Sequence, residues 1–116
     1  MRKVVLDTET TGLDPASGHR VIEIGGVELM NDVPTGQTYQ TYLNPERDIP
    51  EAVFAIHGLS QAFLAHKPVF AAIVDDFLAF IGAAALVIHN AEFDLAFINA
   101  ELAHLGRPPL SANEVI

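Results

Sequence analysis

The sequence predicts a single α/β domain in which helices pack on a mixed β-sheet. Its 116 residues are enough for one hydrophobic core, and half of them are hydrophobic. Apolar residues recur at strand spacing in the first half of the chain and at helical spacing from about residue 50. The resulting order β-β-β-α-β-α indicates a mixed sheet in one domain, with no repeat, linker or second domain.

The first half is expected to form three strands joined by short connections. Asp-Pro and Ser-Gly pairs predict a loop over 13–19, and NDVPTG predicts a turn over 31–36. A β-bulge is expected at Gly25 and Gly26. Two successive hairpin-like connections indicate an antiparallel start to the sheet. The strands, rich in apolar and β-branched residues, are KVVLDTE (3–9), RVIEIGGVEL (20–29) and QTYQTYLNP (37–45).

The second half is expected to be mainly helical. Short helical pieces are predicted over 50–65, with Ser60 as an N-cap. Apolar residues between Phe70 and Ile81 fall at helical spacing and predict an amphipathic helix over about 68–82. The remaining elements are a fourth strand, ALVIHN (85–90), and a helix from the N-cap candidate Asn90 to about Leu105, closed by Gly106.

Composition limits the functional classes. The formal charge is −9, with 15 acidic and six basic residues, which by itself argues against nucleic-acid binding. The absence of cysteine rules out disulfides, thiolate metal sites and a cysteine nucleophile, and favours a cytoplasmic protein. No apolar run is long enough to span a bilayer and no signal peptide is visible, so no membrane partner is expected.

Two carboxylates end the first predicted strand. Asp7 and Glu9 alternate along it, so they project from one face about 6–7 Å apart. Unpaired, they would repel each other and at least one pKa would rise. Asp7 directly follows Val-Val-Leu, where an acid is costly without a partner. Hard divalent cations take oxygen ligands, and two such ions about 3.5–4 Å apart fit between these groups.

Asp94 offers a third carboxylate, in the first turn of the last predicted helix. If the strand over 85–90 lies parallel beside 3–9, the two carboxyl ends meet at the edge where ligands bind in open α/β sheets. Considered singly, Asp94 is explained as a helix N-terminal acid and Glu9 as a strand-end surface residue. Together with Asp7, they favour a metal site.

Three motifs carry a resemblance to a known family. DTETTG (7–12), HGLS (57–60) and HNAEFD (89–94) resemble the first, intermediate and second motifs of the DEDD-type 3′–5′ exonucleases, above all the proofreading subunits of bacterial replicative DNA polymerases. The likeness runs from about Lys3 to Leu105. It implies a ribonuclease-H-like mixed β-sheet flanked by helices. It also implies hydrolysis of the 3′-terminal phosphodiester with two divalent cations, Mg²⁺ or Mn²⁺.

The resemblance also implies roles for the three acids. Asp7 would bridge both metals, Glu9 would bind the metal that activates water, and Asp94 would serve the other metal. Such a pair of ions activates a water molecule as the nucleophile and stabilises the leaving 3′ oxygen in an in-line displacement.

The resemblance further implies eight positions around the terminal nucleotide. Gly12 would permit close backbone approach, and Leu13 would offer an apolar wedge against the last base. Without the motif, His57 is an ordinary loop histidine, and Phe93 is a core residue. The full set is Thr10, Thr11, Gly12, Leu13, Glu51, His57, Asn90 and Phe93. The remaining histidines away from the motifs are expected at the surface: His19, His66 and His104.

One family motif is missing. A His-x-x-x-x-Asp or Tyr-x-x-x-Asp segment supplies the general base and a fourth carboxylate in the family, and no such segment follows Asp94. Residues 1–116 are therefore expected to be the N-terminal portion of an exonuclease domain, with the last strand and helix beyond residue 116. Because a missing general base alone costs about 10²–10⁴-fold, the isolated chain is expected to be nearly inactive.

The expected substrate is a single-stranded or frayed DNA 3′ end. By resemblance, the partners are a polymerase catalytic subunit and, less directly, a sliding clamp. Metals would neutralise several acids, so weak, salt-sensitive DNA binding is compatible with the negative charge. The alternatives are an exoribonuclease of the same superfamily and a catalytically incomplete metal- or partner-binding module. A sugar kinase would need a Gly-rich nucleotide-binding loop, and IGG (24–26) contains too few glycines to form one.

Overall fold

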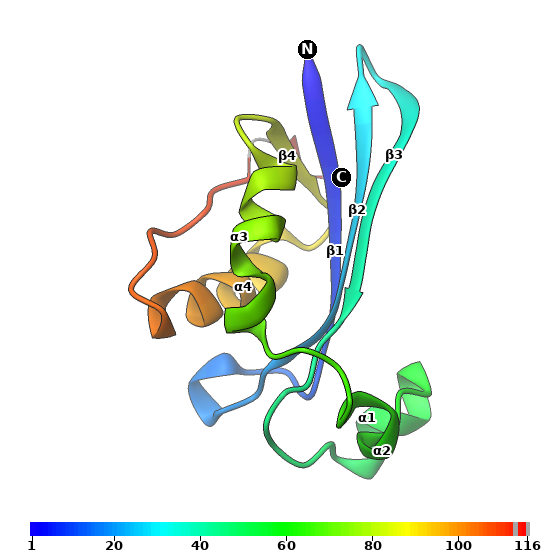
Figure 1. Ribbon diagram of the computed structural model, residues 1–116, viewed down its shortest axis with the longest axis vertical. Helices are drawn as coiled ribbons and strands as arrows, with labels where there is room; N and C mark the ends of the chain where they lie inside the picture. The colour runs from blue at the N-terminus through cyan, green and yellow to red at the C-terminus, as the bar shows by residue number, and fades with distance from the viewer. Residues whose placement is uncertain (113, 116) are drawn as a thin grey trace.

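The computed structural model describes residues 1–112 and 114–115 and contains one mixed β-sheet (Figure 1). The strand order is β3-β2-β1-β4-β5; β1 pairs antiparallel with β2 and parallel with β4. The predicted α/β fold with an antiparallel start is therefore confirmed. The strands are β1 (Arg2–Thr10), β2 (Val21–Met30), β3 (Val33–Tyr42), β4 (Ala85–Ile88) and β5 (Glu114–Val115).

The connection between β2 and β3 is tighter than predicted. Only Asn31 and Asp32 separate the strands, with φ of 51° and 66°. Two central residues with positive φ form a hairpin turn whose twist matches the strands, and Asn and Asp tolerate that conformation. The predicted turn over 31–36 is therefore wrong, and β3 begins at Val33. Pro34 is accommodated because β3 is an edge strand.

The glycine pair on β2 does not form the predicted bulge. Gly25 and Gly26 pair in regular register with β1, opposite Asp7 and Leu6. The register shifts lie elsewhere, between Glu9 and Thr10 on β1 and between Val27 and Leu29 on β2. A Cβ added at Gly26 would lie 3.0 Å from the Phe80 ring, so this glycine instead lets the helix carrying Phe80 approach the sheet.

The longer helices, α3 (Phe70–Ile81) and α4 (Ala91–His104), share one core with the sheet. α3 buries Phe70, Val74, Phe77 and Ile81, which recur at helical spacing and confirm the predicted amphipathic face. These residues pack with buried β1, β2 and β4 side chains and with residues of α4. One face of the sheet therefore supplies the core, and the ends of its strands remain available for a site.

The shorter elements connect the sheet to the helices. They are the 3₁₀ turn η1 (Pro15–Ser17), α1 (Glu51–His57) and α2 (Gln61–Leu64). Ser60 caps α2 as predicted, because its Oγ accepts a 3.0 Å hydrogen bond from the Phe63 N–H. Gly106 has φ of 69° directly after α4 and its C-cap Leu105, as expected for a helix-ending glycine. No helix among the described residues is both long and apolar enough to cross a membrane.

A fifth strand was not anticipated before residue 116. β5 pairs parallel with β4, and Glu114 and Val115 lie opposite Val87 and Ile88. The sheet therefore continues beyond β4 at the very end of the described chain.

Candidate active site

The predicted meeting of two strand ends is present. β1 and β4 run parallel, with Leu6 opposite Ile88, so both strands lead to the same edge of the sheet. Asp7 and Glu9 continue β1 beyond this pair, and α4 begins at Ala91, three residues after Ile88. This order of elements places Asp94, in the first turn of α4, near the end of β1.

Asp94 is a buried acid tied to β1. Its exposed fraction is 5%, and the Thr8 hydroxyl donates a 2.7 Å hydrogen bond to its Oδ1. Burial raises the pKa of Asp94; the Thr8 hydrogen bond opposes this rise and the negative charge of Asp7 adds to it. The Thr8 contact fixes the Asp94 side chain against the strand that carries the other two acids.

Asp7 is exposed, which corrects one argument from the sequence. Strand alternation turns Val4, Leu6 and Thr8 toward the core and Asp7 away from it. The preceding apolar residues therefore do not impose a desolvation cost on Asp7. The reason for an acid at residue 7 therefore lies in the groups that Asp7 faces at the open edge of the sheet.

Glu9 lies in a field of like charges. Burial raises its pKa most, followed by the charges of Asp7, Glu23 and Asp94. Glu23 on β2 lies directly opposite Glu9, and sequence reasoning missed it. Alternation along β2 would have placed Glu23 on the face of Glu9 had the strand register been known.

The acids do not form a closed cluster. Among the residues that the structure describes, no group of three or more His, Cys, Asp or Glu side chains is arranged to hold a metal ion. Asp7, Glu9 and Asp94 nonetheless influence one another electrostatically and offer the oxygen donors that hard divalent cations prefer. The donor chemistry therefore fits hard divalent cations, although like charges favour side-chain positions that keep the acids apart.

An apolar pocket of about 340 Å³ adjoins Glu9. Its walls come from the end of β1, the turn that follows it, α1 and the first turn of α4. Five of the eight positions expected around a nucleotide line it: Thr10, Gly12, Leu13, His57 and Phe93. Thr8 of β1 also lines it. The α1 residues Ala52, Val53 and Ile56 line it as well and were missed, because a seven-residue helix gives too short a periodic signal.

The other three expected positions lie outside this pocket. Thr11 is fully buried: its Oγ1 accepts a 3.0 Å hydrogen bond from the Arg20 N–H and lies 2.9 Å from Nδ1 of His19. Glu51 is exposed in the first turn of α1. Asn90 occupies the N-cap position of α4 without a side-chain cap hydrogen bond. It lines a neighbouring hollow of about 360 Å³ that also includes Leu13 and Phe93.

His19 packs against the turn after β1. A Cβ added at Gly12 would lie 2.5 Å from three atoms of the His19 ring, so only glycine fits beneath it. The Thr11 Oγ1, which accepts from the Arg20 N–H, also lies within hydrogen-bond distance of His19 Nδ1, so one hydroxyl joins the turn to both neighbours. His19 is half-buried, so its expected surface position holds only in part, whereas His66 and His104 are exposed as expected.

His57 presents a polar atom without a partner. Its Nδ1 accepts a 2.9 Å hydrogen bond from the Leu59 N–H, which leaves the proton of the neutral ring on Nε2. Nε2 is buried and has no hydrogen-bond partner among the described residues. Burial lowers the pKa of His57 and the charge of Glu23 partly opposes this shift, so the neutral form is favoured. His57 therefore lines the pocket and carries a buried N–H that has no partner among the described residues.

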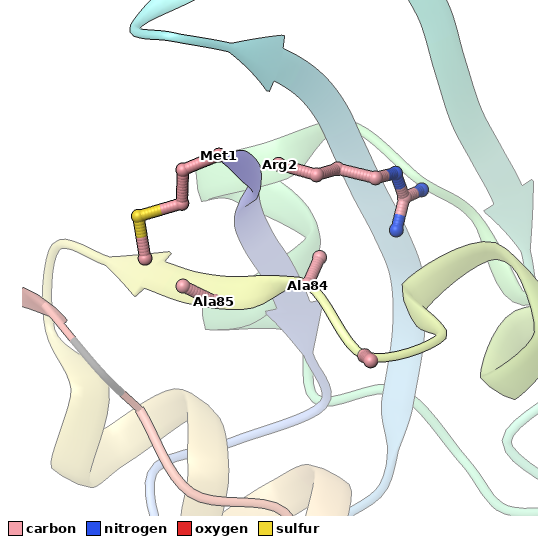
Figure 2. A pocket seen from close by; sticks show the side chains of 5 residues that line it. Met1, Arg2, Ala84 and Ala85 are labelled. Carbon is pink, nitrogen blue, oxygen red and sulfur yellow. The ribbon is translucent and has the colours of Figure 1, made fainter.

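A third hollow, of about 500 Å³, lies at the N-terminal end of β1. Figure 2 shows the Arg2 side chain extending away from Met1 and Ala85. Its guanidinium is engaged with Glu28 and with the carbonyls of Phe80 and Ile81 at the end of α3. This hollow gains no free charged group from Arg2 and lies at the opposite end of β1 from the acids.

Known proteins resemble this chain in sequence and in fold. The family model described as "Exonuclease" (RNase_T) matches residues 4–116. The chain belongs to this exonuclease family. It is 51% identical over 115 residues to the DNA polymerase III subunit epsilon of Rickettsia conorii, covering 99% of this chain and 50% of that protein. The same subunit of Escherichia coli K12 is 44% identical over 110 residues, covering 91% of this chain and 45% of that protein.

The chain thus spans about half the length of the curated relatives it matches. Among solved structures, exonuclease X in complex with 5′-overhanging duplex DNA superposes with a TM-score of 0.71 at 25% identity, covering 97% of this chain and 57% of that one. The nuclease domain of 3′hExo, a DEDDh family member bound to rAMP, superposes with a TM-score of 0.77 at 17% sequence identity. The match covers 92% of this chain and 60% of that one. The ribonuclease-H-like fold and the family resemblance are confirmed.

Proposed function

We propose that the protein carrying this chain is a 3′–5′ exonuclease that removes nucleotides from DNA 3′ ends beside a replicative polymerase. The carrying observation is that a pocket of nucleotide size shares Glu9 with an edge where Asp7 and Asp94 also lie. The relatives named as DNA polymerase III subunit epsilon support both the DNA substrate and a polymerase catalytic subunit as partner. A sliding clamp and a cytoplasmic location are further parts of this proposal.

Asp7, Glu9 and Asp94 are proposed to hold two divalent cations, Mg²⁺ or Mn²⁺. When bound, such ions activate water and stabilise the leaving oxygen of a phosphodiester. The residues of the chain prepare this site in two ways. Thr8 holds Asp94 in place through its 2.7 Å hydrogen bond. Burial raises the pKa of Glu9 most, and the neighbouring acids add repulsion that a cation would remove.

The pocket residues are proposed to position the terminal nucleotide. Leu13, Ile56 and Phe93 supply apolar surface for the base. Gly12 lines the pocket, but the space left by its missing side chain is filled by the His19 ring, so the expected close approach of a ligand to its backbone is not available on that side. The unpaired Nε2–H of His57 is suited to donate to a sugar or phosphate oxygen. By the family match, Thr10 and Thr11 belong to the same nucleotide-binding segment as Gly12, and Glu51 faces the sugar. Asn90 lines the neighbouring hollow.

The test uses the full-length protein with a 5′-labelled single-stranded DNA oligonucleotide and Mg²⁺. The wild type is expected to shorten the DNA from its 3′ end, and D7N and D94N are expected to reduce this activity by at least the 10–100-fold typical of damage to a metal site. Asp76→Asn is the matched control, since it removes one charge from an exposed acid on α3. Intact cleavage by D7N and D94N would refute the assignment of the site.

A parallel assay separates the alternatives. RNA of the same sequence should be degraded more slowly than DNA by a proofreading exonuclease. Faster RNA degradation would favour the exoribonuclease, for which the 3′hExo–rAMP neighbour is a structural precedent. A wild type that binds Mn²⁺ without cleaving either polymer would favour the metal- or partner-binding module.

A further inference from the structure

Two aromatic rings and one cation form a cluster beyond the pocket. Tyr42, at the end of β3, and Phe63, in α2, pack edge to face with ring centroids 5.1 Å apart and an interplanar angle of 78°. The Lys67 ammonium lies 4.5 Å from the Phe63 ring centroid and 5.7 Å from that of Tyr42. Both distances are within the range of a cation–π interaction. We name these residues the Tyr42–Phe63–Lys67 cluster.

Lys67 differs from the other cations of the chain. Among the described residues, it is the one basic side chain whose recorded partners are only aromatic rings. An ammonium on an aromatic face keeps hydrogen-bond donors available for an anion. The other cations have carboxylate or carbonyl partners: Arg2 with Glu28, Lys3 with Asp32, Arg20 with Glu101, Arg107 with Asp75, and Arg47 with the carbonyls of Gly18 and Asp48.

The register of the sheet fixes where the cluster lies. Tyr42 is directly opposite Glu23, and Glu23 is directly opposite Glu9. Directly opposed residues of antiparallel strands project from the same face, so Tyr42 shares the face of Glu9. The two residues are two strand spacings apart, about 10 Å. α1, which forms one wall of the pocket, directly precedes the segment that carries Phe63 (Figure 1).

The chemistry of the cluster matches single-stranded nucleic acid. Proteins that bind single strands without sequence preference combine aromatic surfaces, on which bases stack, with cations along the backbone. Phe63 is 42% exposed, which leaves ring surface for a base, and Lys67 supplies the charge for a phosphate. An acidic peptide would use Lys67 but would leave the exposed aromatic ring without a matching group, so the cluster favours a nucleotide.

We propose that the Tyr42–Phe63–Lys67 cluster binds the nucleotides that precede the terminal one in a single-stranded DNA whose 3′ end occupies the pocket. A base stacks on Phe63, and Lys67 contacts the adjacent phosphate. The inference rests on the proposed exonuclease function, because it takes the direction of the strand from the pocket. It adds a second contact that holds the strand while its last nucleotide is removed.

The test compares full-length wild type, F63A and K67Q with R107Q. Arg107→Gln is the matched control, because it removes one positive charge from a residue paired with Asp75 of α3. Binding is measured by the anisotropy of a labelled phosphorothioate oligothymidylate, which resists hydrolysis, across a series of salt concentrations. Turnover is measured on unmodified oligothymidylate and on the p-nitrophenyl ester of thymidine 5′-phosphate, which fills only the terminal position.

The expected loss is confined to the oligonucleotide. F63A should weaken its binding about tenfold, within the range for one stacked base. K67Q should reduce the slope of log affinity against log salt by about 0.7, the value for one phosphate contact of a single strand. Turnover of the mononucleotide ester should stay at the wild-type value in both variants, and R107Q should match the wild type in every assay.

Three results would overturn the proposal. Equal losses on the oligonucleotide and the mononucleotide ester would show a structural role for the cluster. Unchanged oligonucleotide binding in F63A and K67Q would exclude the contact. Unchanged DNA binding with weaker binding to the polymerase catalytic subunit would assign the cluster to a protein partner. If the wild type binds the phosphorothioate through the cluster but hydrolyses neither substrate, the proposed function fails and the binding site stands.

Discussion

The hydroxyl of Thr8 donates a 2.7 Å hydrogen bond to the buried carboxylate of Asp94. This contact joins β1 to the first turn of α4 across 86 residues of sequence. Thr8 lies between Asp7 and Glu9 on β1 but projects from the opposite face. One strand therefore presents two acids at its open face and secures a third through its buried face.

Thr8→Val is expected to loosen this arrangement. Valine keeps the shape of threonine but leaves a buried acceptor without its donor, which costs about 1–3 kcal/mol. Affinity for Mn²⁺ should fall about 10–100-fold, since the contact orients a proposed ligand. Urea unfolding and Mn²⁺ titration of the full-length protein measure the two effects. Thr8→Ser retains the hydroxyl and should retain most of the affinity; equal losses in the serine and valine variants would exclude the hydrogen bond as the cause.

Asp94→Asn separates the cost of the acid from its use. Burial raises the pKa of Asp94, so its charged form is disfavoured in the folded protein. Asparagine keeps an oxygen that accepts from Thr8 and carries no charge. The metal-free variant should be as stable as the wild type, or more stable by about 1 kcal/mol, at neutral pH. A large loss of metal-free stability, measured by urea unfolding, would identify Asp94 as a structural acid.

The pH dependence of metal-free stability follows from the same acids. The pKa of Asp94 and that of Glu9 are raised above their ordinary values of 3.8 and 4.5. The folded protein then holds protons that the unfolded chain releases, so this stability is present below the ordinary values and is lost as pH rises through the folded-state pKa values. From about pH 4 to 7, the free energy of unfolding should fall more steeply for wild type than for D94N. Parallel curves would contradict the assignment.

Added Mg²⁺ should reverse this trend. A cation binds the ionised acids, so its stabilising effect should grow as pH rises and the carboxylates lose their protons. Thermal unfolding with and without Mg²⁺ at each pH measures the difference. A stabilisation that is independent of pH would indicate that Mg²⁺ binds elsewhere.

The sequence predicted best the acidic residues that follow apolar strands. Asp94 was expected at the same sheet edge as Asp7 and Glu9 on the condition that β4 pairs parallel with β1, and this pairing is present. The partner of Glu9 was not expected, because Glu23 becomes its neighbour only through the strand register. The predicted turn over 31–36 is also too long. The positive φ of Asn31 and Asp32, which makes a two-residue turn possible, is a property of the folded hairpin.

Gly12→Ala should disrupt the turn that lines the pocket. Its Cβ would lie 2.5 Å from the His19 ring, and relief of such overpacking costs about 1–3 kcal/mol. His19→Ala should create the missing space, so the double variant should be more stable than the two single effects predict. Unfolding free energies of the four proteins form the cycle. Strictly additive effects would show that His19 is not what excludes a side chain at residue 12.

Arg20 and Glu101 are expected to act as a unit that holds α4 on the sheet. The Arg20 Nε and Nη2 donate to the two carboxylate oxygens at 2.8 and 2.6 Å, and Glu101 is 3% exposed. The Val21 N–H, at the start of β2, adds a third bond of 3.2 Å to the same carboxylate. Since α4 also carries Asp94, this pair fixes the helix that supplies the third acid.

Arg20→Met should therefore cost about 3–5 kcal/mol, because it leaves the Glu101 charge buried and unpaired. Arg20→Met combined with Glu101→Leu removes both charges, so it should recover part of that loss in urea unfolding. Mn²⁺ affinity should recover together with stability if the pair acts on the site by holding α4. If the double variant regains stability without regaining Mn²⁺ affinity, Glu101 positions Asp94 by a route other than the anchoring of the helix.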